Sequence, residues 1–140
     1  MLNIYVLEDH FIQQNRIEEV IHTILKKNNI KVGDFEVFDK PNQLLDFITE
    51  RGSHQLFFLD IQIKDDTKKG LEVAKQIRKS DPYANIVFFT THSEYLPLTF
   101  QYQLAALDFI DKSLEGEDFQ KRLESIILLT CKKIQSQNPE

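Results

Sequence analysis

Five polar side chains of kinds that bind metal ions or phosphate groups stand at the ends of short apolar stretches. They are Glu8, Asp9, Asp60, Thr90 and Lys112. Carboxylates are preferred ligands of Mg²⁺, while a hydroxyl and an ammonium group can hold phosphoryl oxygens. Taken singly, an acid at a strand end is commonly a solvated loop residue, a threonine there is usually structural, and a lone lysine is usually a surface charge. The prediction of a site therefore depends on all five occurring together.

Five short apolar stretches predict the β-strands that carry these side chains. The stretches are 2–7, 35–38, 56–59, 85–90 and 106–110. Between and after them, apolar residues recur with the period of an amphipathic helix. The predicted helical segments are 17–25, 41–51, 70–81, 94–103 and 119–134. Pro41 suits the first turn of a helix, Gly52 is placed to end one, and Pro97 is compatible with a helix only in its first turn.

Strands that alternate with helices predict a parallel sheet whose two faces are covered by helices. The expected fold is α/β and flavodoxin-like, a doubly wound five-stranded sheet of strand order 2-1-3-4-5. In that order the first and third strands are neighbours, so Glu8, Asp9 and Asp60 meet at the carboxyl edge of the sheet, where ligands bind in such folds. We expect one domain over residues 1–134 and a polar tail, or the start of a linker, over residues 135–140.

Three carboxylates crowded at one edge cannot all stay ionised without a counter-charge. Mg²⁺ is the natural counter-charge, because it favours carboxylates, a carbonyl and several waters in an octahedron. One carboxylate could then attack a phosphorus atom and form an acyl phosphate. Lys112 and a threonine hydroxyl, from strands on the other side, would hold the phosphoryl oxygens.

The composition excludes several other classes of protein. A formal net charge of -5 argues against this chain binding a nucleic-acid backbone by itself. Its single cysteine, Cys131, excludes an internal disulfide. No apolar run approaches the ~20 residues that cross a bilayer, and no signal peptide is recognisable, so we expect no membrane association and a cytoplasmic location.

These residues resemble those of the receiver domain of two-component response regulators, which have a CheY-like fold. The resemblance covers about residues 2–130 and is also carried by the segments 57–60 and 70–72. It implies that Asp60 is a phosphoacceptor and that a sensor histidine kinase supplies the phosphoryl group. It further implies that the domain is not a turnover enzyme, although it catalyses its own phosphotransfer and dephosphorylation.

The same resemblance implies a magnesium ligand set. Asp9 and Asp60 would bind Mg²⁺ through their side chains, Gln62 through its backbone carbonyl, and Glu8 mainly through water. Three residues would form the opposite side of the site. Thr90 is the implied switch hydroxyl, Lys112 the phosphate-binding lysine, and Phe109 the aromatic residue whose rotamer follows the threonine.

Three features of the sequence bear on the geometry and chemistry of the site. The loop over residues 60–70 is longer than in most receivers and has no proline after Gln62. Ser113 stands where most receivers have a cis-proline, so Lys112 lacks that brace. His92 lies where this family tunes hydrolysis of the acyl phosphate.

A narrower resemblance links the segments 58–64, 85–94 and 105–112 to the receivers of AgrA/ComE-like regulators. Those proteins carry a LytTR DNA-binding domain after the receiver. The resemblance implies transcriptional control in quorum sensing, competence or bacteriocin production. We expect DNA to be contacted only through an output domain absent from these 140 residues.

One apolar group is too dense for a single short helix to bury. It comprises Tyr95, Leu96, Leu98, Phe100 and Tyr102. Part of this group, with the edge of the fifth strand and the last helix, is predicted to form a homodimer surface on phosphorylation.

Two other functions remain as alternatives. Aspartate-nucleophile phosphatases carry an Asp-x-Asp at the end of their first strand, whereas here Asp60 follows the third strand and residue 62 is glutamine. A pseudo-receiver, acting as a phosphorylation-independent interaction module, ranks second to the phosphoacceptor. The four histidines show no metal-ligand spacing, and His22 is expected at the surface or partly buried beside an apolar helix stripe.

Overall fold

A computed structural model gives the architecture of residues 1–64, 66 and 68–137. The elements in chain order are β1 (Leu2–Leu7), α1 (Phe11–Lys27), β2 (Val32–Phe38), α2 (Pro41–Phe47), β3 (Gln55–Leu59), α3 (Lys69–Ser80), β4 (Asn85–Thr90), the 3₁₀ turn η1 (Ser93–Tyr95), α4 (Leu96–Gln101), β5 (Asp108–Asp111) and α5 (Gly116–Gln137). The sheet is parallel with order β2-β1-β3-β4-β5, which confirms the predicted fold.

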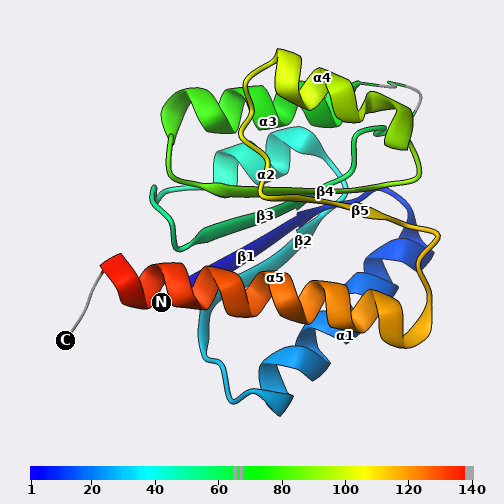
Figure 1. Ribbon diagram of the computed structural model, residues 1–140. Coiled ribbons are helices and arrows are strands. Elements are labelled where there is room, and N and C mark those ends of the chain that lie inside the picture. The colour runs from blue at the N-terminus through cyan, green and yellow to red at the C-terminus, as the bar shows by residue number, and fades with distance from the viewer. Residues whose placement is uncertain (65, 67, 138–140) are drawn as a thin grey trace.

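The helices form two layers on the sheet. Figure 1 shows α1 and α5 on one face and α2, α3 and α4 on the other. Strands β1, β3 and β4 are buried along their whole length, because helices cover both faces. Their side chains alternate between two cores: Ile4 and Val6 pack beneath α1 and α5, whereas Tyr5 and Leu7 pack beneath α2 and α3.

Several predicted boundaries were wrong. β2 begins at Val32, three residues before the predicted start. β5 spans Asp108–Asp111 and not 106–110, because Ala105 has a left-handed φ of 51° and the chain is still turning into the sheet there. An alanine does not indicate such a turn, since a left-handed conformation favours glycine.

The helix boundaries also differ from prediction. α2 ends at Phe47, because Ile48 is already extended at φ −69°, ψ 121°, so Gly52 lies in the following loop and does not end the helix. Pro97 lies in the first turn of α4, as expected. α5 continues to Gln137, three residues into the predicted tail, and residues 138–140 lie outside the described part of the chain.

Candidate functional site

The sheet register brings the predicted acids together. Leu7 of β1 pairs with Leu59 of β3, so the residues that follow them leave the sheet side by side. The backbone N–H of Asp60 extends this pairing by donating to Leu7 O over 3.0 Å. Glu8, Asp9 and Asp60 therefore place one carboxylate oxygen each within 4.8 Å of one another. Prediction of the cluster from strand ends alone is confirmed.

Lys112 lies inside this carboxylate cluster. Its backbone N–H donates to Thr90 O over 3.0 Å, which aligns β5 with β4 at the same edge. Its ammonium donates to Asp60 Oδ2 over 2.7 Å and contacts Glu8 Oε1. The side chain is only 8% exposed, and its ammonium lies 5.2 Å from the centroid of the Phe89 ring. One cation thus partly compensates two buried carboxylates.

Glu8 is the least compensated member of the cluster. It is fully buried, and its Oε1 depends on the Lys112 ammonium, a cation that it shares with Asp60. Burial is the main cause that raises the pKa of Glu8 to about 7, against the lowering effect of Lys112, and the nearby Asp60 raises it further. Three neighbouring carboxylates, two of which share a single buried ammonium, are a donor set that fits a hard divalent cation.

The cluster opens to solvent through a cavity of about 320 Å³. Asp9, Asp60, Gln62 and Lys112 line it, and His92 stands at its wall. Solvent access on one side and buried carboxylates on the other suit a site where a small charged group enters from outside.

The long loop after Asp60 folds back onto this cavity. Lys64 donates its backbone N–H to Asp9 Oδ2 over 2.7 Å, and the Gln62 side chain donates to Lys64 O over 3.2 Å. Gln62 N–H reaches Asp60 Oδ1 over 3.3 Å. Buried Ile63 anchors the loop in the core beneath α3. The loop therefore positions Asp9, which the sequence did not reveal.

Gly70 lets the first turn of α3 pack directly against the backbone of Asp60 and Ile61. A Cβ at this position would lie 1.7 Å from the Asp60 carbonyl oxygen, so only glycine fits here in the first turn of α3. Its N–H donates to Ile61 O over 2.7 Å. This close packing and this hydrogen bond fix the backbone at Asp60 and Ile61 against the first turn of α3.

The two predicted switch residues do not line this cavity. Thr90 is fully buried, and its Oγ1 accepts the His92 N–H over 3.1 Å. The neighbouring Thr91 lines the cavity instead. Phe109 is half-buried, packs at 6.2 Å between ring centroids against Phe88, and lines a groove beside α4.

Arg16 of α1 holds the loop that follows Lys112. Its Nη1 donates to Lys112 O over 2.8 Å, its Nη2 bonds Leu114 O, and its guanidinium lies 3.9 Å from the centre of the Phe119 ring. These contacts flank Ser113, where the brace of a cis-proline was expected to be missing, and the described residues contain no cis peptide bond. Sequence reasoning missed Arg16, because nothing local marks a contact that spans 96 residues.

Among the described residues, no histidine belongs to a group of side chains that could hold a metal ion. His22 is exposed, pairs with Glu18 and packs on Phe35, as expected of a surface residue. His92 is held by Glu94 through a 3.0 Å contact of its Nδ1. No helix within the described residues is both long and apolar enough to span a bilayer.

Comparison with known proteins places these features in context. The response regulator receiver domain family matches residues 4–124. The chain is 35% identical over 116 residues to accessory gene regulator protein A of Staphylococcus epidermidis, which covers 83% of this chain and 48% of that protein. The Staphylococcus aureus protein of the same name is 33% identical over the same shares. The chain thus spans about half the length of these relatives.

Solved structures share the fold. The response regulatory domain of protein mrkE from Klebsiella pneumoniae superposes with a TM-score of 0.65 at 24% identity, over 97% of each chain. The non-phosphorylated HemR receiver domain from Leptospira biflexa superposes with a TM-score of 0.71 at 20% identity, over 91% of this chain and 94% of that one.

Proposed function

The chain belongs to the response regulator receiver domain family, and we propose that Asp60 is its phosphoacceptor, phosphorylated in a Mg²⁺-dependent reaction by a sensor histidine kinase. The observation that carries this proposal is the Lys112 ammonium, held between Asp60 Oδ2 and the under-compensated Glu8. A purely structural ion pair would not need a third carboxylate at an open cavity.

In this proposal each residue has a defined task. Glu8, Asp9, Asp60 and the Gln62 carbonyl would hold Mg²⁺, which when bound neutralises the carboxylates and the incoming phosphoryl oxygens. An Asp60 oxygen attacks phosphorus, an O–P bond forms, and the N–P bond to the kinase histidine breaks, with the electron pair leaving on that nitrogen. The Lys112 ammonium then binds a phosphoryl oxygen in place of the Asp60 carboxylate.

Thr90 and Phe109 would transmit the phosphorylation of Asp60 to the surface between α4 and β5. The Thr90 hydroxyl oxygen already accepts the His92 N–H, which leaves its hydrogen available to donate to a phosphoryl group on Asp60. Movement of the β4–α4 loop toward the phosphoryl group would free space near Phe109 and change the surface between α4 and β5.

That surface has the character of an interface. Three members of the predicted apolar group, Tyr95, Leu98 and Tyr102, pack against the core beneath α3, whereas Leu96 and Phe100 remain exposed, Phe100 by 77%. They line a groove of about 680 Å³ that continues to Phe109 and Arg122. We propose that phosphorylation drives homodimerisation through the face formed by α4, β5 and α5.

The dimer is tested by sedimentation of the protein with Mg²⁺ and beryllofluoride, which mimics the phosphoryl group. The wild type should sediment as a dimer, and Phe100→Asp should remain a monomer because it places a charge in the groove. Tyr83→Asp is the matched control, since Tyr83 is also an exposed aromatic residue, 69% exposed, outside this groove. A wild type that stays monomeric at high concentration would contradict the proposal.

The remaining parts of the proposal concern the whole protein. Residues 1–134 would form the receiver, and residues 135–140 would lead to a LytTR DNA-binding domain that alone contacts DNA. Similarity to accessory gene regulator protein A supports cytoplasmic transcriptional control in peptide quorum sensing. The domain would act as a signalling switch with self-catalysed phosphotransfer, not as a turnover enzyme.

Binding of beryllofluoride tests the phosphoacceptor directly. With Mg²⁺, the backbone amide signals of Asp60, Thr90 and Lys112 should shift in an NMR titration. Asp60→Ala should abolish these shifts, whereas Asp46→Ala, which removes an exposed carboxylate from α2, should leave them unchanged. Absence of shifts at millimolar Mg²⁺ would favour a pseudo-receiver.

A further inference from the structure

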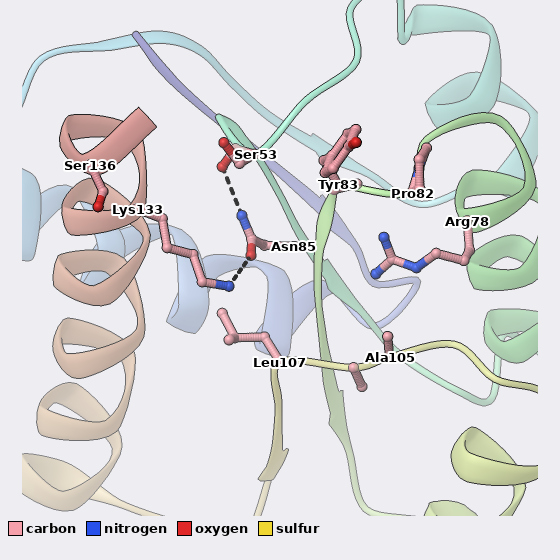
Figure 2. A pocket seen from close by; sticks show the side chains of 11 residues that line it. Ser53, Arg78, Pro82, Tyr83, Asn85, Ala105, Leu107, Lys133 and Ser136 are labelled. Atoms are coloured by element: carbon pink, nitrogen blue, oxygen red, sulfur yellow. Dashed lines mark hydrogen bonds between the residues drawn. The ribbon is translucent and has the colours of Figure 1, made fainter. Parts of the chain in front are cut away.

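A second polar cavity lies at the opposite, amino-terminal edge of the sheet. It has a volume of about 530 Å³ and lies between the ends of α3 and α5, where β4 begins and the chain enters β5. Figure 2 shows Arg78 and Lys133 extending into it from opposite sides, with Ala105 and Leu107 below them. Its location separates it from the acidic site at the carboxyl edge.

Within the described residues, neither cation forms an ion pair with a carboxylate. Arg78 donates Nε to Leu104 O over 2.8 Å and Nη1 to Asp81 O over 3.1 Å, and both acceptors are neutral carbonyls. Lys133 donates Nζ to the side-chain oxygen of Asn85 over 2.9 Å. Among the described residues that line the cavity there is no acid. In a chain with a net charge of -5, two cations sharing an acid-free cavity are unusual.

The one acid near Arg78 is already committed to the backbone. Asp81 Oδ1 accepts the N–H groups of Tyr83 and Ala84 over 3.0 and 3.1 Å, and Oδ2 accepts the Gly52 N–H over 2.8 Å. The hydrogen bonds of this carboxylate therefore go to the backbone around the turn before β4, and it acts on the guanidinium only through its charge. The positive charge of Arg78 stays available to a ligand.

The Lys133 ammonium is held in place by a buried amide. Asn85 is only 4% exposed, and its Nδ2 donates to Ser53 O over 2.7 Å. This bond fixes the amide, so its oxygen orients Lys133 toward the cavity (Figure 2). The cations are thus fixed by neutral partners, an arrangement that suits a bound anion.

We propose that this cavity binds an oxyanion group, such as a phosphate, sulfonate or carboxylate, carried on a small apolar or aromatic body. Arg78 and Lys133 bind the anion from two sides, and the Ser136 hydroxyl lies at the same wall. The exposed ring of Tyr83 and the Leu107 side chain supply apolar surface for the body of the ligand. The site does not depend on the proposed phosphorylation of Asp60.

Two sulfonates of equal charge test both halves of the proposal. Methanesulfonate and benzenesulfonate are titrated without Mg²⁺ and followed by backbone amide NMR; neither can phosphorylate Asp60. Both should shift the amides of residues 83–85 and 105–107, and benzenesulfonate should bind at least several-fold more tightly. Equal affinities would overturn the role of the apolar wall.

Matched variants separate the site from general charge effects. Lys133→Gln should weaken benzenesulfonate binding about tenfold, the effect of one charge-assisted hydrogen bond. Lys132→Gln removes the same charge from the neighbouring position of α5, outside the cavity, and should change nothing.

Arg78→Gln should weaken benzenesulfonate binding at least as much as Lys133→Gln does. Arg78 also donates to a backbone carbonyl, so Arg78→Gln removes a bond that supports the fold. Lys133 donates to the side chain of Asn85, so Lys133→Gln tests the site without removing a bond to the backbone. The proposal is wrong if Lys132→Gln weakens binding as much as Lys133→Gln, or if the shifts occur only near Lys112.

Discussion

The two ends of β1 bury polar side chains in opposite ways. At its start, Asn3 Nδ2 donates to Gln55 Oε1 over 2.7 Å, Asn3 Oδ1 accepts the Asp34 N–H over 2.8 Å, and Gln55 Nε2 donates to Glu50 O over 3.0 Å. Just past its end, Glu8 is buried beside Asp9 and Asp60, and it shares the ammonium of Lys112 with Asp60.

The polar group at the start of β1 is structural, whereas the carboxylate cluster past its end is functional. Each amide group of the Asn3–Gln55 pair has hydrogen-bond partners, so the pair needs no ligand and contributes only to stability. The carboxylate cluster is charged and incomplete, so it is stable only with a counter-ion and is free to exchange one cation for another. Buried polar groups therefore indicate a functional site where carboxylates outnumber the cations beside them, rather than where polar groups are numerous.

Removing Lys112 should produce the largest effect. Lys112→Met leaves Glu8 and Asp60 without their cation, so the free energy of unfolding at pH 8 should fall by about 3 kcal/mol. Added Mg²⁺ should restore most of this loss. Urea denaturation with and without Mg²⁺ measures both, and Lys121→Met, on the exposed face of α5, is the control. Equal stability of Lys112→Met and wild type would remove the contrast between the two ends of β1.

The pH dependence of stability should come largely from Glu8. Its pKa is raised from 4.5 to about 7, so between these pH values the native protein binds more protons than the unfolded chain. Stability without Mg²⁺ should therefore fall as the pH rises from 4.5 to 7, by up to about 3 kcal/mol from this group. Glu8→Gln should lose that part of the slope in urea denaturation. An unchanged slope would show that Glu8 is ionised in the native state throughout.

The amide network should behave as structure alone. Asn3→Ala removes the donor to buried Gln55 Oε1 and the acceptor of the Asp34 N–H, so the free energy of unfolding should fall by about 2 kcal/mol. Because no bond connects this network to the carboxyl edge, the affinity for beryllofluoride should stay within about twofold of wild type. A large loss of that affinity would mean that the two ends of β1 are coupled.

Arg16 should have the smallest effect on stability and a selective effect on the site. Arg16→Gln removes the bonds to the carbonyls of Lys112 and Leu114, so Lys112 is less well positioned and phosphorylation by a small acyl phosphate should slow about tenfold. Arg16→Lys, which can still bond one carbonyl, should recover part of that rate. Equal rates in wild type and Arg16→Gln would limit Arg16 to packing on Phe119.

The features that could be predicted from the sequence are those set by hydrophobic periodicity and by the residues at the strand ends. The carboxyl ends of parallel strands lie at one edge of the sheet, so the clustering of Glu8, Asp9 and Asp60 could be predicted from the sequence alone. Lys112 could be assigned to the same edge for the same reason. Their burial and the pKa of Glu8 depend on packing by both helix layers and needed the structure.

Other features had no local signal. The left-handed Ala105 is not a glycine, so the late start of β5 could not be predicted. Arg16 reaches the Lys112 loop across the fold. The cavity of Arg78 and Lys133 brings together α3 and α5, whose charged residues read in sequence as ordinary solvated helix faces.

The central claim is that Asp60 accepts a phosphoryl group, and mass spectrometry of the intact and digested protein tests it most directly. After incubation with Mg²⁺ and a small acyl phosphate, the protein should gain one phosphoryl group, located at Asp60. The gain should be absent when Mg²⁺ is chelated and in Asp60→Asn. An unmodified wild type, or a phosphoryl group gained equally by Asp60→Asn, would contradict the account.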